Sequence, residues 1–328
     1  MSFTIFVTAP RLAAAGLRIL EEADCNVLFL PEGAGAREAE AIMASNAVDA
    51  VISRTATLTA AAIGASPRLR VISKHGVGVS NIDVSAATAQ GIPVYVTPGA
   101  NAQSVTELTV GLMIAAARRI ALLDREMRAG RWTRAQDGVQ LCGKRLGLVG
   151  FGQVGQRVAR VAQALGMQVH AHDPMLKGAC PVEGVTLHAQ LEAMLPMCDV
   201  LSLHIPLTGK TRNLIDANAL DLLPHGAILI NTARGEVIDE TALIERLKSG
   251  RLAGAGLDTM SEEPLPAGHS LASLPTVILT PHVGGSTEAA LETMAEGAAR
   301  NVLGWLNGKP PERASCVNPE VLPSLQLA

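Results

Sequence analysis

The stretch 145-RLGLVGFGQVGQRVARVAQALGMQVHAHDP-174 decides the fold of the second half of this chain. An apolar run leads into the spacing Gly150-x-Gly152-x-x-Gly155, which opens an amphipathic segment of helical character. A second apolar run follows and ends at Asp173. Among 31 glycines this spacing can arise by chance. Strand, glycine loop, helix and acid in this order nevertheless predict a dinucleotide-binding βαβ unit rather than a glycine turn that binds nothing.

The parts of this unit have separate roles in binding. The first glycine permits a tight turn, the second lets the pyrophosphate approach the backbone, and the third allows close helix–strand packing. The helix then begins at Gln153 and Val154, which would bring N–H groups and the positive end of the helix dipole to the phosphates. Asp173 would accept hydrogen bonds from the adenosine ribose and repel a 2′-phosphate. The expected cofactor is therefore NAD rather than NADP.

Outward from this unit, short apolar runs alternate with helical segments along the chain. This alternation predicts parallel sheets covered by helices on both faces. The first half contains five such runs, at 4–9, 26–30, 49–53, 69–73 and 93–97. The second half contains six, at 145–150, 167–172, 199–204, 226–231, 252–258 and 276–280. Six strands make a complete dinucleotide-binding sheet.

Two long helical segments flank the second set of strands. Residues 101–130 form the longest helical stretch, with Asn101 as the expected N-cap and Gly130 as the expected stop. A second stretch at 288–308 precedes a Pro-rich tail. We therefore expect a NAD-binding domain at 100–287, inserted into a substrate domain made of 1–99 and 288–328.

Composition excludes several classes of protein. A chain of 328 residues with 48% hydrophobic and 17% charged residues is long enough for two globular domains. A net charge of −3 gives no reason to expect nucleic acid or an anionic membrane as a partner. No apolar run approaches the roughly 20 residues of a membrane span. Five scattered cysteines predict free thiols in a reducing cytoplasm, with neither disulfides nor a metal site.

Three polar residues follow strands of the second half. They are Arg234, Glu263 and His282, and open α/β sheets bind their ligands at this edge. Singly, each could be a surface arginine, a solvated acid or a capping histidine. Together, a histidine can donate a proton to a carbonyl, and a neighbouring carboxylate would orient the ring and favour its protonated form. An arginine can bind a carboxylate with two hydrogen bonds. This set predicts a 2-keto acid reductase, in which Gly284 and Gly285 make room for the nicotinamide.

The chain resembles the D-isomer-specific 2-hydroxyacid dehydrogenase family over nearly its whole length. The resemblance is carried in order by 74-KHGVGVSNID-83, 97-TPGANAQSVTELTVGLMIAAAR-118, GFGQVGQ, HDP at 172–174, 231-NTARGEVIDE-240, the LD…EEP run and 281-PHVGGST-287. It implies a Rossmann domain inserted into a flavodoxin-like one, and a homodimer formed through the NAD-binding domain. It also implies catalytic roles for Arg234, Glu263 and His282.

Further site residues are implied by the same resemblance. Asp258 and Ala233 would line the nicotinamide side, together with Arg234 and His282. Substrate carboxylate binding is expected from the backbone at Gly76, Val77 and Gly78, near Asn101 and Arg234. Three residues depart from the family pattern, namely Ser80, His75 and Thr106. They bear on the shape of the substrate pocket and leave the catalytic set intact.

Three cations suggest the substrate's tail. The resemblance implies that Arg54, Lys74 and Arg134 match basic residues with which the family's 3-phosphoglycerate dehydrogenases hold the phosphate, Arg134 reaching across from a neighbouring subunit. The alternative is that they are solvated surface cations, and for Arg134 taken alone that alternative is favoured. We therefore expect a short form of such an enzyme, without an appended regulatory domain. Hydroxypyruvate, glyoxylate or another 2-keto acid is the alternative substrate. A NAD-binding corepressor is the alternative of another class, and formate dehydrogenase is disfavoured because its histidine pairs with glutamine.

Overall fold

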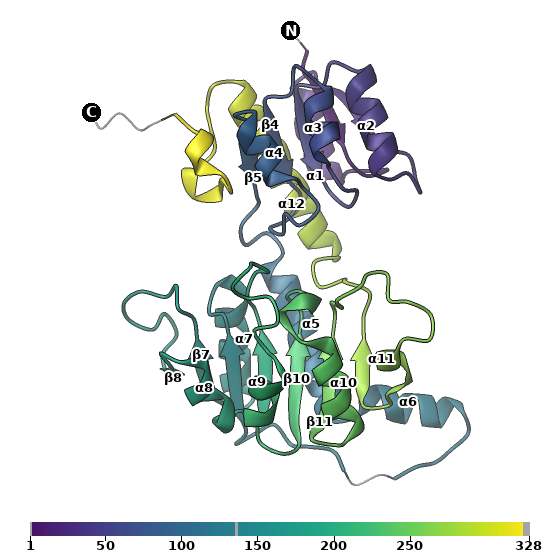
Figure 1. The fold of residues 1–328 in the computed structure, drawn as a ribbon, viewed down its shortest axis with the longest axis vertical. Coiled ribbons are helices and arrows are strands. Elements are labelled where there is room, and N and C mark those ends of the chain that lie inside the picture. The colour runs from purple at the N-terminus through teal and green to yellow at the C-terminus, as the bar shows by residue number, and fades with distance from the viewer. Residues whose placement is uncertain (1, 135–136, 324–328) are drawn as a thin grey trace. The chain divides into compact units, whose positions relative to one another are not determined.

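The chain folds into two α/β units. The computed structural model describes residues 2–134 and 137–323. One unit comprises Met1–Asn101 and Thr287–Ala328, and the other comprises Ala102–Ser286. These divisions lie close to the boundaries that the sequence suggests, at 99/100 and 287/288. Each unit is built around its own all-parallel sheet, as the fold-class prediction requires (Figure 1).

The first unit has five parallel strands in the order β2-β1-β3-β4-β5. This order is that of flavodoxin-like sheets. The strands match the five apolar runs found in the sequence, and only β4 extends one residue beyond its run: β1 (Thr4–Val7), β2 (Asn26–Phe29), β3 (Ala50–Ser53), β4 (Val71–Lys74) and β5 (Val94–Tyr95).

Helices cover both faces of this sheet: α1 (Ala14–Glu22), α2 (Ala36–Ser45), α3 (Ala60–Ala65), α4 (Val84–Ala89) and α12 (Glu288–Leu306). Successive side chains of β1 point to opposite faces of the sheet. Ile5 packs in the core beneath α1 and α12, and Phe6 packs in the core on the other face. A Cβ on Gly16 of α1 would lie 2.6 Å from the Ala295 carbonyl oxygen. Glycine is therefore required where α1 and α12 cross.

The second unit has seven parallel strands in the order β12-β11-β10-β9-β6-β7-β8. They are β6 (Arg145–Val149), β7 (Gln168–His172), β8 (Val185–Leu187), β9 (Val200–Leu203), β10 (Ala227–Asn231), β11 (Leu252–Leu257) and β12 (Val277–Leu279). From β8 to β11 this is the order of a Rossmann sheet, and β12 adds one strand. The expected number of six was wrong because β8 is short and largely exposed, so it leaves no apolar run.

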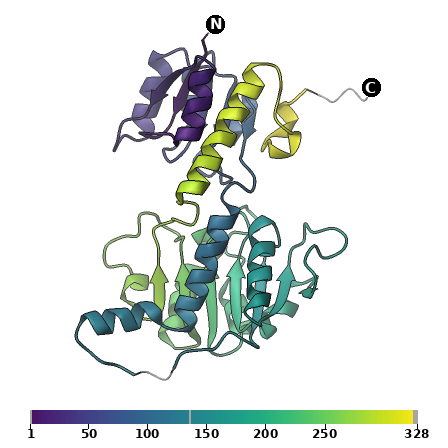
Figure 2. The ribbon, with the colours of Figure 1, turned by 180° about the vertical axis from the view of Figure 1, so that it is seen from behind.

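The prediction of one continuous helical stretch at 101–130 was also wrong. The segment forms α5 (Ala102–Ala117) and α6 (Ile120–Arg128), separated by a residue in the left-handed region, Arg119 at φ 52°. Figure 2 shows α5 along one face of the sheet and α6 turning away from it. Gly130, at φ 75°, follows the end of α6 as expected. The longest described helix is α12, with 19 residues.

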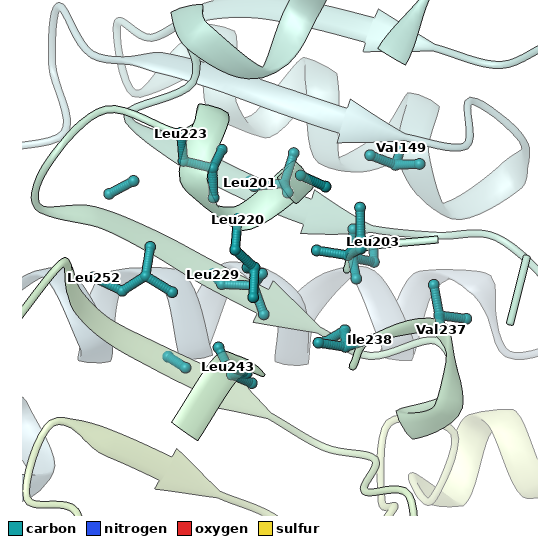
Figure 3. Close-up of a cluster of buried hydrophobic side chains, with 14 of the residues drawn as sticks. Val149, Leu201, Leu203, Leu220, Leu223, Leu229, Val237, Ile238, Leu243 and Leu252 are labelled. Carbon is teal, nitrogen blue, oxygen red and sulfur yellow. The ribbon is translucent and has the colours of Figure 1, made fainter. Parts of the chain in front are cut away.

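The remaining helices complete the second unit's layers. They are α7 (Gln153–Ala164), α8 (Leu191–Met194), α9 (Ala217–Leu222), α10 (Glu240–Lys248) and α11 (Ser270–Ser273), with 3₁₀ turns at Leu195–Met197 and Gly235–Val237. Leucines from β9, β10, α9 and α10 interdigitate in one of its cores (Figure 3). No helix among the described residues is long and apolar enough to cross a membrane. The five cysteines are free.

Candidate active site

The glycine loop between β6 and α7 has the geometry that dinucleotide binding requires. Gly150 lies at φ 93°, and a Cβ on it would lie 2.5 Å from the His204 carbonyl oxygen. A Cβ on Gly155 would lie 2.4 Å from the Gly150 carbonyl oxygen. Gly152 has open space at its Cβ position, and no side chain caps the helix that it precedes. Packing therefore requires two of the glycines, while the middle one keeps the approach to the helix open.

The acid after β7 lies beside this loop. Asp173 accepts a hydrogen bond from the Phe151 N–H through Oδ2 at 2.8 Å, and one from the Met175 N–H through Oδ1 at 2.9 Å. A carboxylate has about four acceptor sites, so both oxygens can still accept a ribose hydroxyl. The residues therefore fit NAD: α7, beginning at Gln153 and Val154, would meet the pyrophosphate, and Asp173 would meet the ribose.

Arg234 is positioned by a buried asparagine that the sequence analysis missed. Asn231, the last residue of β10, accepts a hydrogen bond from the Ala233 N–H at 2.9 Å. Its amide also donates to the Arg234 carbonyl at 2.8 Å. A polar residue at the end of the otherwise apolar run AILIN was the available signal. The turn after β10 is therefore held by the fully buried side chain of Asn231.

Glycine brings the loop after β10 against the loop after β11. A Cβ on Gly235 would lie 1.9 Å from the Met260 carbonyl carbon, so no other residue can occupy this position without moving one of the loops. The second loop carries Glu263, and its Oε1 accepts a hydrogen bond from the Met260 N–H at 3.1 Å. This bond leaves Oε2 for another partner.

That partner is His282, which follows β12. The Nδ1 atom of His282 lies 2.7 Å from Oε2 of Glu263, and both side chains are partly exposed. The structure thus forms the expected acid–histidine pair. With Nδ1 engaged, Nε2 is the ring nitrogen left to meet a substrate. His282 adopts φ 53°, and its N–H donates to the Asp258 carbonyl at 2.8 Å.

Asp258 holds the loop that carries the histidine. It is 1% exposed, and its Oδ1 accepts from the Thr280 hydroxyl at 2.6 Å and from the Val283 N–H at 2.8 Å. Oδ2 accepts from the Gly284 N–H at 2.8 Å. A Cβ on Gly284 would lie 3.0 Å from that oxygen, so glycine permits this close approach. We expected a cofactor-lining role for Asp258, and its role in positioning the loop was missed.

In the first unit, the loop after β4 offers backbone donors. The Gly76 N–H donates to Thr97 Oγ1 at 3.0 Å, and the Gly76 carbonyl accepts from the Thr97 N–H at 2.9 Å. Among the described residues, the N–H groups of Val77 and Gly78 have no hydrogen-bond partner. Of the three residues predicted to bind a substrate carboxylate, Gly76 thus has its N–H engaged within the protein, while Val77 and Gly78 have theirs available. Gly76 instead anchors the loop.

The cations of the first unit have different surroundings. Arg54 donates from Nη1 to the Arg11 carbonyl at 2.6 Å. Burial, and then the charge of Arg11, lower the pKa of Arg54. The Lys74 ammonium donates to the Arg54 carbonyl at 2.6 Å and to Asn81 Oδ1 at 2.7 Å. Lys74 therefore holds the chain after β3, which the sequence did not show.

His75 lies with the two arginines around a cavity of about 360 Å³, which Glu288 and Glu292 also line. The imidazole is 8% exposed, and Nε2 has no hydrogen-bond partner among residues 2–134 and 137–323. Burial, with the charge of Arg54, lowers the pKa of His75 to about 4. The ring is therefore neutral at pH 7.

The remaining predicted residues occupy simpler positions. Asn101 directly precedes α5, Arg134 is exposed in the segment after α6, and Gly285 is half-buried in the turn after His282. Within the described part of the chain, no group of three or more His, Cys, Asp or Glu side chains could hold a metal ion.

Comparison with known proteins shows which family this chain belongs to. Residues 110–284 match the model of the D-isomer specific 2-hydroxyacid dehydrogenase, NAD binding domain. The D-3-phosphoglycerate dehydrogenase of Methanocaldococcus jannaschii is 39% identical over 98% of this chain and 61% of its own length. The hydroxypyruvate reductase of Thermotoga maritima is 44% identical over 74% of this chain and 80% of its own.

A solved structure extends the similarity to the fold. The NAD⁺-bound 3-phosphoglycerate dehydrogenase of Entamoeba histolytica matches with a TM-score of 0.83 and 27% identity, over 97% of this chain and 99% of that one. The family model covers more than half of the chain and lies within the second unit. The chain therefore belongs to the D-isomer specific 2-hydroxyacid dehydrogenase family, and its second unit is the NAD-binding domain.

Proposed function

We propose that this protein is a NAD-dependent dehydrogenase that interconverts a D-2-hydroxy acid and its 2-keto acid. The pairing of His282 with Glu263 at 2.7 Å, in a domain whose glycine loop and Asp173 fit NAD, carries this proposal. Such a pair supplies the proton that reduction of a carbonyl requires. Bound NADH supplies the hydride.

In the proposed reaction, the residues of the second unit transfer the proton and hold the reacting end of the substrate. His282 donates a proton from Nε2 to the keto oxygen during reduction and takes it back during oxidation. Glu263 holds Nδ1, so the ring keeps one orientation, and its negative charge stabilises the imidazolium form. Arg234 binds the substrate carboxylate with its planar guanidinium and polarises the adjacent carbonyl. Asp258 acts indirectly, by fixing the loop of His282.

The first unit adds further groups that recognise the substrate. The unpaired N–H groups of Val77 and Gly78 are suited to one end of a carboxylate. The cavity beside them supports an anionic tail, because Arg54 is partly buried near a second cation, Arg11. Glu288 and Glu292 line the same cavity, but within the described part of the chain neither forms an ion pair with Arg54 or Arg11, and a phosphate would compensate the two cations. We therefore propose 3-phosphoglycerate as substrate, with hydroxypyruvate or glyoxylate as the alternative.

The assembly that we propose is a cytoplasmic homodimer formed through the NAD-binding domain. Support comes from α6, which has no buried residues although Ile120 and Met127 are apolar and half-exposed. Trp132, just beyond this helix, is 72% exposed. An apolar surface of this kind is typical of an interface between subunits. Arg134 follows in the same segment, where it could serve a neighbouring subunit.

The function is tested with NADH and a panel of glyoxylate, hydroxypyruvate and 3-phosphohydroxypyruvate. We expect the highest kcat/KM with the phosphorylated compound. Arg54→Ala should lower that value by roughly 10- to 100-fold, the scale of a charge-assisted hydrogen bond, and should affect glyoxylate little. Arg37→Ala, at another position of the same unit outside the cavity, is the matched control.

The possible results test the reaction type and the substrate separately. Reduction of none of the three compounds with NADH would contradict the dehydrogenase assignment. A higher kcat/KM for hydroxypyruvate or glyoxylate would instead reject the phosphate tail and leave the reaction type standing. Equal losses in Arg54→Ala and Arg37→Ala would remove Arg54 from substrate recognition.

A further inference from the structure

The first unit contains a second cavity, of about 810 Å³, which the proposed reaction does not use. One wall is made by the segments that lead into β4 and β5, including Arg70 and Gln90. The other is made by the chain after α12, including Pro311 and Arg313. Its volume lies in the range of pockets that hold small organic ligands.

Hydrogen bonds along the edge of the sheet fix the second wall. After α12 the chain returns beside β5, where the Val96 N–H donates to the Ser315 carbonyl at 2.9 Å and the Val317 N–H donates to the Val94 carbonyl at 2.8 Å (Figure 1). The buried Asn318 adds a bond from the Val94 N–H to its Oδ1 at 2.8 Å. The wall is therefore part of the fold, and the cavity is preformed.

Two aromatic rings line the cavity. Tyr95 of β5 is 0% exposed, and its ring centroid lies 6.0 Å from that of Trp305 in α12. The Tyr95 hydroxyl has no hydrogen-bond partner among the described residues. Burial raises its pKa to about 12, so it stays a protonated donor. The hydroxyl itself is closed off from solvent, so Tyr95 belongs to the wall beneath the partly exposed ring of Trp305.

The charges around this aromatic floor have one sign. Arg70 and Arg313 line the cavity, and none of the described lining residues is acidic. Arg70 is exposed and forms no ion pair within the described part of the chain. Arg313 donates to the Pro319 carbonyl at 2.8 Å through one nitrogen, which leaves its other N–H groups available. The cavity thus combines an apolar aromatic interior with a cationic rim.

We infer that this cavity binds a small organic anion that has an aromatic or branched apolar body and a carboxylate or sulfonate group. The body would lie against Trp305, and the anion would face the two arginines. This site is separate from the NAD and keto acid sites, so it does not depend on the proposed reaction.

Fluorescence can test this site directly, because the chain has only two tryptophans. Trp132→Phe removes the exposed one and leaves Trp305 as the reporter. With 8-anilino-1-naphthalenesulfonate as the probe, we expect saturable binding of one molecule per chain, with energy transfer from Trp305. Saturating NAD⁺ should not displace the probe.

Two further variants in the Trp132→Phe background locate the probe. Gln90→Phe fills the cavity from an exposed position and should abolish binding. Arg70→Glu should raise the Kd about three- to tenfold, as expected for reversal of an exposed charge. Arg18→Glu, an exposed arginine of α1 outside the cavity, should leave the Kd unchanged. Circular dichroism checks that each variant is folded.

Three results would overturn the inference. They are absence of saturable binding, displacement by NAD⁺, and a Kd that Gln90→Phe leaves unchanged. Activity with keto acids is measured separately, so failure here and failure of the proposed reaction give different results.

Discussion

The two units differ in whether the polar groups of their functional loops are hydrogen-bonded within the protein. In the second unit, the loops after β10, β11 and β12 have their polar groups engaged within the protein: Asn231 holds the Arg234 turn, and Asp258 holds the His282 loop. In the first unit, the loop after β4 leaves the N–H groups of Val77 and Gly78 without partners among the described residues.

This difference follows the demands of chemistry and recognition. A group that transfers a proton must be held in a narrow range of positions before the substrate arrives, which favours a dense network of buried bonds. A group that binds a carboxylate needs donors that remain unsatisfied until the ligand supplies an acceptor. We therefore expect substitutions that disturb the His282 loop to affect kcat and those in the loop after β4 to affect KM.

The largest effect should come from the proton donor. His282→Ala removes the imidazole, and kcat should fall roughly 10²- to 10⁴-fold, the usual range for general acid–base catalysis. The Kd for NADH, measured by fluorescence titration, should change little. His225→Ala, at an exposed loop position of the same unit, is the control. Turnover at the wild-type rate in His282→Ala would show that His282 only caps the loop.

The second effect tests positioning. Asp258→Asn keeps the size of the side chain but replaces one acceptor oxygen with an NH₂ group, which only donates, so the side chain can no longer accept from both the Val283 and the Gly284 N–H groups. We expect kcat to fall roughly 10- to 100-fold and stability to fall by about 1–3 kcal/mol in urea unfolding, the usual cost of an unsatisfied buried group.

Asp216→Asn is the matched control for this change. Asp216 caps α9 by accepting from the Ala219 N–H at 2.8 Å, and asparagine caps nearly as well as aspartate. Equal effects of the two substitutions on kcat would mean that Asp258 does not position His282.

Much of the fold could be predicted because its strands are buried on both faces. Eleven of the twelve strands lie in apolar runs, whereas β8 is short, exposed and without such a run. The break between α5 and α6 was missed for a different reason. Arg119 adopts the left-handed region inside a sequence of strong helix formers, and local propensity cannot show this.

The site was predictable where chemistry depends on residue type and unpredictable where it depends on contacts. The Glu263–His282 pair follows from which side chains can exchange protons at one sheet edge. Bonds between residues far apart in the chain, such as that from Gly76 to Thr97, could not be read from the sequence. Such bonds decide which of several candidate donors remains free.

A third test uses pH and a buried histidine of the first unit. Because the pKa of His75 is lowered to about 4 by burial and by Arg54, the unfolded chain binds a proton between about pH 6.5 and 4 that the folded chain does not. Stability should therefore be lost as the pH falls through this window, by up to about 1.4 kcal/mol per pH unit from this residue.

His75→Gln should reduce that slope in urea unfolding measured from pH 7 to 4.5. His225→Gln, which removes an exposed histidine, controls for the loss of a titratable residue. If His75→Gln has the wild-type slope, the imidazole is not held neutral by its surroundings.

The smallest expected effect distinguishes the roles of Lys74 and Arg54, which the sequence analysis placed together in the phosphate site. Lys74 bonds Asn81, in the loop after β4, and the Arg54 carbonyl, so Lys74→Met should loosen the loop after β4, while the Arg54 side chain keeps its own bond to the Arg11 carbonyl. We expect a fewfold rise in KM for phosphorylated and unphosphorylated keto acids alike, because the loop after β4 is displaced for both. Arg54→Ala should act on the phosphorylated compound alone. The measurement is the ratio of kcat/KM for 3-phosphohydroxypyruvate to that for hydroxypyruvate, which Lys74→Met should preserve. If Lys74→Met lowers this ratio as much as Arg54→Ala does, Lys74 contacts the phosphate directly. Its hydrogen bonds to the Arg54 carbonyl and Asn81 would then be replaced by bonds to the phosphate when the substrate binds.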